Sequence, residues 1–131
     1  MTYEEAELVF AYQLALISSP SKGARTKRWE EYNSTIHEYG PSFLSEEAFR
    51  EAESTDFITS FVLGKVKNHT FRTITDDDVL AYYRENADLF TRAEGDPFAP
   101  EEVREIIIKR LREREYRENV EAISLQHRDS Q

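Results

Sequence analysis

The feature that most constrains this chain is helical periodicity with few helix breakers, because its 131 residues include only four glycines and four prolines. Apolar residues recur at three- and four-residue spacing in several stretches, which places their side chains on one face of a helix. Hydrophobic residues make up 39% of the chain, enough for a packed core at this length. We therefore predict an all-α fold of about five helices in a single helical domain, residues 1–131.

Capping signals locate three of the predicted helix starts. Thr2 followed by Glu5 fits a capping box, and Ser45 is a favourable N-cap residue. Thr75 precedes three aspartates, whose charges complement the positive end of a helix dipole. The helices predicted from these starts cover residues 2–18, 45–68 and 75–90.

Two further helices are predicted from side-chain spacing. The first follows a loop at residues 18–23, ends at Gly40 and Pro41, and buries a largely aromatic stripe of Trp29, Tyr32, Ile36 and Tyr39. The second begins at Glu101 and would span roughly 40 Å at about 1.5 Å per residue, longer than a compact domain of this size needs. This length, together with a first helix that is apolar on both sides, favours a homodimer.

Composition excludes several kinds of chemistry. The chain has no cysteine, so a disulfide scaffold or a thiolate site cannot form, and we expect no metal and no cofactor. The formal net charge of −9 disfavours nucleic acid and anionic membranes as partners. The longest apolar run, residues 8–17, is about half a membrane span and follows acidic residues, so we predict a cytoplasmic protein without a membrane anchor.

The segment from Ile74 to Phe90 carries a resemblance to a known family. It reads Ile-Thr-Asp-Asp-Asp-Val-Leu-Ala-Tyr-Tyr-Arg-Glu-Asn-Ala-Asp-Leu-Phe, and a helix rich in phenylalanine precedes it. This order is similar to the N-terminal helical chaperone module of SurA and parvulin-type foldases. Residues 45–90 and 100–128 resemble that module and the C-terminal helix that packs back on it.

The resemblance implies peptide binding without prolyl isomerase activity. The strand and the glycine-rich motifs that carry the isomerase site of these foldases have no counterpart after Phe90. The chain passes instead from the loop around Pro97 into the final helix. The expected function is therefore a chaperone-like module that binds a peptide or an unfolded polypeptide.

Few residues are candidates for a functional site. The basic side chains of Arg25 and Arg28 precede Trp29 and Tyr32 and could dock a peptide, whereas balance by neighbouring acids is the structural alternative. Tyr82 could face a ligand, because its neighbour Tyr83 follows the apolar stripe. His69 is the one candidate for a general base, at the expected end of a helix.

Two alternative functions are also compatible with the sequence. The first is a small enzyme of natural-product or antibiotic biosynthesis that holds a precursor peptide in position for a cross-link or a macrocycle, since proximity alone can lower a barrier. The second is a structural dimerisation subunit. The sequence shows no nucleophile motif and no phosphate-binding loop, so covalent catalysis and nucleotide chemistry are not expected.

Overall fold

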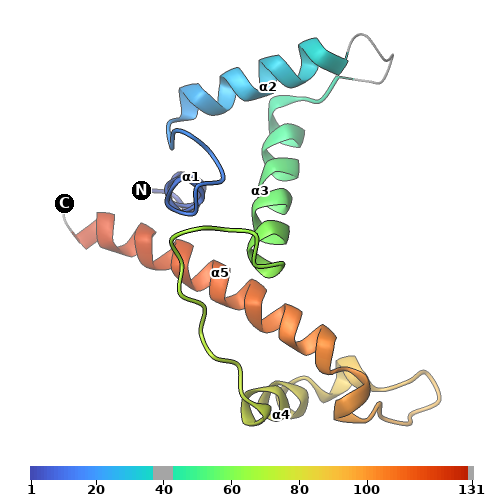
Figure 1. The fold of residues 1–131 in the computed structure, drawn as a ribbon. Helices are drawn as coiled ribbons and strands as arrows, with labels where there is room; N and C mark the ends of the chain where they lie inside the picture. Colours follow the sequence, from blue (N-terminus) through green and yellow to red (C-terminus); the bar gives the residue numbers. More distant parts are fainter. Residues whose placement is uncertain (37–42, 130–131) are drawn as a thin grey trace. The chain divides into compact units, whose positions relative to one another are not determined.

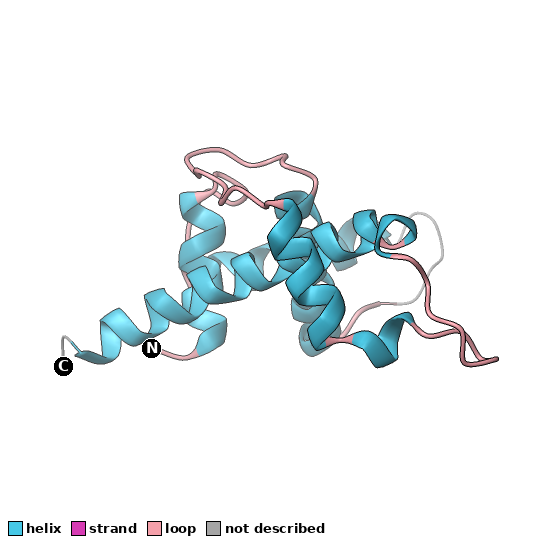
Figure 2. Cartoon of the chain, turned by 90° about the horizontal axis from the view of Figure 1, so that it is seen from below, coloured by secondary structure: helices cyan, strands magenta, loops and turns pink. Residues whose placement is uncertain are grey.

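The computed structural model describes residues 1–36 and 43–129, and the described residues form helices and loops (Figures 1 and 2). The predicted helix end at Gly40 and Pro41, and also Tyr39 and His37, lie outside the described residues. The predicted all-α class is confirmed, because the described residues contain one isolated antiparallel bridge, Thr91 to Pro97, and no strand. The α-helices within these described ranges are α1 (Tyr3–Gln13), α2 (Lys22–Ile36), α3 (Glu46–Val62), α4 (Asp76–Glu85) and α5 (Arg104–Asp129).

The three predicted caps are present. Thr2 forms a capping box with Glu5, and the Ser45 hydroxyl accepts a hydrogen bond from the amide of Ala48 at 3.1 Å. Thr75 forms a second capping box with Asp78, whose carboxylate accepts a hydrogen bond from the Thr75 amide at 2.9 Å. The bonds to Thr75 hold the pKa of Asp78 below its ordinary value. The aspartate run therefore starts a helix, as predicted.

Five helix boundaries differ from the prediction, and two of them are the end of α4, at Glu85 instead of Phe90, and the start of α5, at Arg104 instead of Glu101. The first helix ends at Gln13 instead of Ser18, and the third ends at Val62 instead of Asn68. The second begins at Lys22, inside the predicted loop, where the Ser21 hydroxyl accepts a hydrogen bond from the amide of Ala24. The loop predicted after Phe90 is confirmed, and the 3-10 turn η3 (Pro100–Glu102) leads from it into α5.

The chain divides into two compact units, and the assignment of one domain stays a prediction. Unit 1 comprises residues 1–69 and 116–131, so it contains α1, α2, α3 and the part of α5 from Tyr116 onward (Figure 1). Its core holds both large aromatic and aliphatic side chains. The fully buried ones are Leu8, Leu14, Phe61, Tyr116 and Val120. The final helix thus packs back on the N-terminal helices, as expected.

Unit 2 comprises residues 70–115 and contains α4, the 3-10 turn η2 (Ala87–Phe90), η3 and the start of α5. Its core is a cluster of Val79, Phe90, Val103 and Ile107. The ring of Tyr83 stacks on that of Phe90 with centroids 5.6 Å apart and an interplanar angle of 10°. The apolar face predicted for residues 79–90 is therefore the face that α4 and η2 bury against α5.

Candidate functional site

The end of α1 is a tight turn with a strained residue. The amide of Leu16 donates to the carbonyl of Ala11 at 2.9 Å, and the amide of Ala15 donates to that of Tyr12 at 3.0 Å. This pair of bonds defines a Schellman motif, in which the residue after the C-cap adopts the left-handed conformation. Here that residue is Ala15, with φ of 61°, although glycine is the residue that adopts this conformation without strain.

The end of α3 is the same motif with a glycine in the critical position. Lys65 donates to the Ser60 carbonyl at 2.9 Å, and Gly64 donates to that of Phe61 at 3.0 Å. Gly64 has φ of +73°. The sequence suggested that the helix continues through Gly64 at a small cost, but this left-handed glycine ends it.

The two helix ends are joined by hydrogen bonds. The Lys67 amide donates to the carbonyl of Leu14 at 3.1 Å, and Asn68 Nδ2 donates to that of Gln13 at 3.2 Å. Asn68 also has a positive φ, 61°, which asparagine tolerates better than most residues. The segment after α3 is therefore fixed beside the turn that follows α1.

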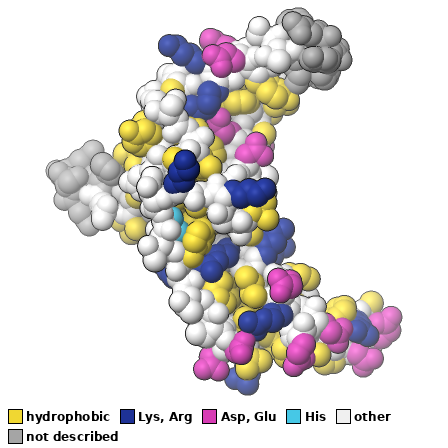
Figure 3. Space-filling model, in the orientation of Figure 1, with side chains coloured by type: hydrophobic (Ala, Val, Ile, Leu, Met, Phe, Trp, Pro, Cys, Tyr) yellow, Lys and Arg dark blue, Asp and Glu magenta, His cyan; other side chains and the backbone are white. Residues whose placement is uncertain are grey.

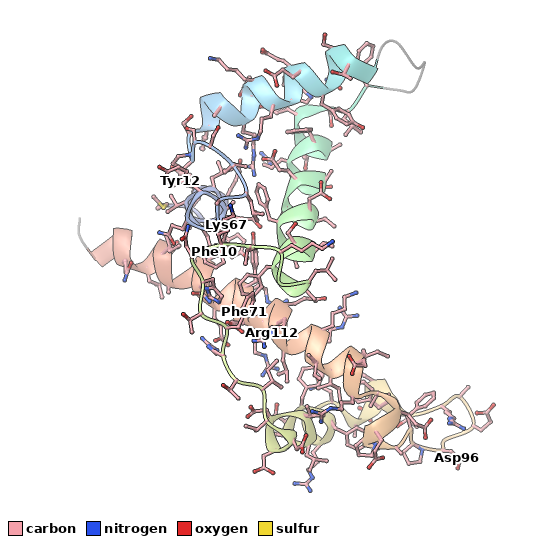
Figure 4. The ribbon with its side chains drawn as sticks, viewed as in Figure 1. Phe10, Tyr12, Lys67, Phe71, Asp96 and Arg112 are labelled. Carbon is pink, nitrogen blue, oxygen red and sulfur yellow. The ribbon has the colours of Figure 1, made fainter. Side chains whose placement is uncertain are left out.

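A shallow groove of about 530 Å³ lies between these segments. We call it the Tyr12 groove, because that side chain is 50% exposed, whereas Phe10 on the same helix is buried at 4% (Figure 4). Leu16 and Ile17 add half-buried aliphatic surface, and the neighbouring polar groups are amides and a hydroxyl. The lining residues are Tyr12, Gln13, Ala15, Leu16, Ile17, Ser18 and Asn68. Such a surface can hold apolar side chains and offer hydrogen bonds to a backbone.

His69 follows the groove residue Asn68 but belongs to the aromatic cluster of unit 1. Its ring lies 4.9 Å from that of Phe61 and 6.0 Å from that of Phe10, measured between centroids. Phe10 and Phe61 also contact the buried ring of Tyr116, at 5.4 and 5.5 Å. The structure thus gives His69 a packing role beside the groove, and a catalytic role stays a prediction.

Arg25 and Arg28, the two candidate arginines, both bind Glu53 of the same chain instead of facing outward toward a peptide. Arg25 is only 3% exposed, and its Nε donates to Glu53 Oε1 at 3.0 Å while Nη1 donates to Glu4 at 3.1 Å. Arg28 binds both oxygens of Glu53, at 2.7 and 2.8 Å. Burial alone would raise the pKa of Glu53, but the bonds and charges of Arg28 and Arg25 outweigh it and lower that pKa. This geometry supports the structural alternative for both arginines.

The candidate aromatic residues also have partners within the chain. Trp29 Nε1 donates to the Leu44 carbonyl at 2.8 Å. Tyr32 remains 39% exposed and packs against Phe49 with ring centroids 5.8 Å apart. Tyr82 lies in unit 2, where it is half-buried and the Arg114 guanidinium lies 5.3 Å from its ring centroid. Tyr32 is thus the most accessible of these three predicted contacts.

Sequence reasoning missed a buried carboxylate in unit 1. Glu7 is 5% exposed, and its Oε2 accepts hydrogen bonds from Ser54 Oγ and Tyr116 Oη, both at 2.7 Å. Burial, followed by the charge and hydrogen bond of Glu7, raises the pKa of Tyr116 far above its ordinary value. The signal in the sequence was that Glu7 stands directly between the apolar residues Ala6 and Leu8. Its two hydrogen-bond partners, however, lie 47 and 109 positions away along the chain.

Two kinds of site are absent from the described residues. Within residues 1–36 and 43–129 there is no cluster of three or more histidine, aspartate or glutamate side chains placed to hold a metal ion. Among the helices of the same described part, none is both long enough and apolar enough to cross a bilayer.

Comparisons with known proteins identify the fold but no family. No protein-family model matches the chain, and no curated protein matches it. Two crystal structures of the GH136 lacto-N-biosidase from Eubacterium ramulus are similar. The selenomethionine derivative has a TM-score of 0.80 at 23% identity over 95% of this chain, and the native protein has 0.76 at 22% over 93%. This chain spans only 28% and 27% of the length of those two chains. At this low identity the similarity shows a shared helical fold.

Proposed function

We propose that this chain is a polypeptide-binding helical module that acts in a chaperone-like manner without prolyl isomerase activity. The observation that carries the proposal is the Tyr12 groove, where an exposed aromatic ring and two aliphatic side chains lie beside polar groups. Apolar grooves of this kind hold extended polypeptide through non-directional contacts and a few hydrogen bonds. The resemblance of residues 45–90 to a foldase chaperone module supports the same function.

The structural comparison supports a module that works beside another protein. Because the matching part is 28% of a glycoside hydrolase chain, this helical fold occurs as one part of a larger enzyme. A partner for such a module would be a polypeptide, either unfolded or in a neighbouring domain. Glycosidase activity does not form part of the proposal.

The Tyr12 groove can be tested with two matched substitutions. We expect Tyr12→Ala to weaken binding to apolar peptides of an immobilised peptide library by about tenfold, the effect of losing one buried aromatic contact. Tyr3→Ala removes a ring that is 41% exposed and lies outside the groove lining, and should leave binding unchanged. Suppression of client aggregation should follow the same order. Failure of the unmodified protein to bind any peptide would contradict the proposal.

The homodimer stays a prediction that light scattering at increasing concentration tests. One reason for expecting it was the apolar character of α1 on both sides. In the structure Leu8 and Phe10, on different sides of α1, are both buried inside unit 1, whereas Tyr12 of the same helix stays 50% exposed. Among the described residues, no contact specifically favours the peptide-maturation alternative. Detection of a modified product formed from a precursor peptide would establish it.

A further inference from the structure

Unit 2 carries a second, smaller groove between the start of α4 and the turn η3. Its volume is about 290 Å³, which suits one or two side chains better than a large ligand. The floor is apolar, because Val79 is almost fully buried and Leu80 and Pro100 are half-buried. We call it the α4–η3 groove, and its lining residues are Asp76, Val79, Leu80, Pro100, Glu101 and Arg104.

The rim of this groove is acidic. Arg104 is the only base among the lining residues, and its Nη1 lies 2.6 Å from Asp76 Oδ1, so these two charges neutralise each other. The Glu101 carboxylate has neither an ion pair nor a hydrogen bond to any residue in the described part of the chain. A negative charge therefore stands beside apolar surface without a counter-ion from the protein.

The surroundings strengthen this charge. Residues 76–105 contain ten acidic side chains and three basic ones, and two of these bases, Arg92 and Arg104, are already paired with acids. Figure 3 shows several Asp and Glu side chains, with Lys and Arg among them, at the lower end of the view, where α4 and the loop before α5 lie. The field of such a surface attracts basic segments and repels acidic ones.

We propose that the α4–η3 groove binds a segment of a partner polypeptide in which an apolar side chain lies next to lysine or arginine. The apolar side chain enters between Val79, Leu80 and Pro100, and the neighbouring cation pairs with Glu101. This site goes beyond the proposed function, because it lies in unit 2, does not involve Tyr12 and selects for charge.

A short labelled peptide tests the groove directly. Fluorescein-labelled Gly-Ser-Lys-Leu-Lys-Leu-Lys-Gly-Ser is titrated with the full chain, and fluorescence anisotropy gives the Kd at low and high salt. We expect salt-sensitive binding that weakens at least tenfold when the lysines are replaced by glutamate or the leucines by serine. Binding that survives both replacements would overturn the proposal, as would the absence of binding.

Two charge reversals separate the groove from the general acidic field. Glu101→Lys should weaken peptide binding about tenfold, whereas Glu94→Lys makes the same change of net charge in the nearby loop and should have less than a threefold effect. Equal effects of the two reversals would contradict a defined site. Binding of uncharged apolar peptides, which tests the Tyr12 groove, is measured separately, so the two grooves can fail independently. A dimer that dissociates on Glu101→Lys would assign the groove to a second copy and also overturn the proposal.

Discussion

The buried carboxylate of Glu7 receives two hydroxyl hydrogen bonds, and one of its donors can be removed with little change of shape. Tyr116→Phe deletes the hydroxyl but keeps the ring against Phe10 and Phe61. A hydrogen bond to a charged group contributes about 1.5–3 kcal/mol, so we expect a loss of that size in the free energy of unfolding. Urea denaturation at neutral pH measures it, with Tyr12→Phe as the control.

The same tyrosine makes stability depend on alkaline pH. Its pKa is raised in the folded protein, so above the ordinary value near 10 the unfolded chain loses a proton that the folded chain keeps. Stability due to this group is thus complete below about pH 10 and declines above it, by up to about 1.4 kcal/mol per pH unit. Tyr116→Phe should reduce that decline. An equally steep decline in the variant would show that other groups cause it.

Backbone strain at Ala15 predicts a stabilising substitution. Ala15 and Gly64 occupy the same left-handed position of two Schellman motifs, so they form a matched pair. We expect Ala15→Gly to raise the free energy of unfolding by about 1 kcal/mol and Gly64→Ala to lower it by a similar amount. A Cβ on Gly64 would meet nothing within 4 Å, so its effect reports backbone conformation alone. Changes of the same sign in both variants would refute this explanation.

At the scale of elements, Glu53 attaches α2 to α3 through two arginines. Glu53→Gln leaves Arg25 buried with fewer acceptors, and breaking such a buried pair costs about 3 kcal/mol. Because the pKa of Glu53 is lowered on folding, its stabilisation is present above its ordinary value near 4.5 and is lost as pH falls below that. The difference between the variant and the parent protein should therefore be large at pH 7 and smaller at pH 3. Glu51→Gln, on the exposed side of α3, is the control.

The three capped helix starts were predictable from the sequence, but most helix ends were not. The caps at Thr2, Ser45 and Thr75 depend on side chains three positions away, which a sequence displays directly. The apolar pattern continues beyond Gln13 and Val62, whereas the helices stop because Ala15 and Gly64 turn left-handed. Alanine has no preference for the left-handed conformation, so the sequence does not indicate a helix end at Ala15.

The candidate site was harder to predict than the fold. The Tyr12 groove depends on bonds between Asn68 and Gln13, 55 positions apart, and no local pattern encodes such a distance. Arg25 and Arg28 were recognised as unusual, but their partner Glu53 lies 25 or more positions away on another helix. Local signals thus determined the helices, and the contacts between helices determined the site.

At the scale of the whole molecule, the two units should respond separately to loss of core volume. Ile107 and Val120 are both fully buried on α5, one in each unit. Truncation of such side chains to alanine costs on the order of 1–4 kcal/mol. We expect Ile107→Ala to speed hydrogen exchange mainly in residues 70–115, and Val120→Ala mainly in α1 and α3. The same set of faster amides in both variants would show a single cooperative unit.

The single tryptophan gives this chain a built-in optical probe. Trp29 is held by the Leu44 carbonyl inside unit 1, and unit 2 contains no indole at all. Its emission therefore reports the opening of the α2 and α3 region, whereas far-ultraviolet circular dichroism averages over every helix. Recording both signals during one denaturant titration would distinguish a concerted transition from two successive ones without attaching a label.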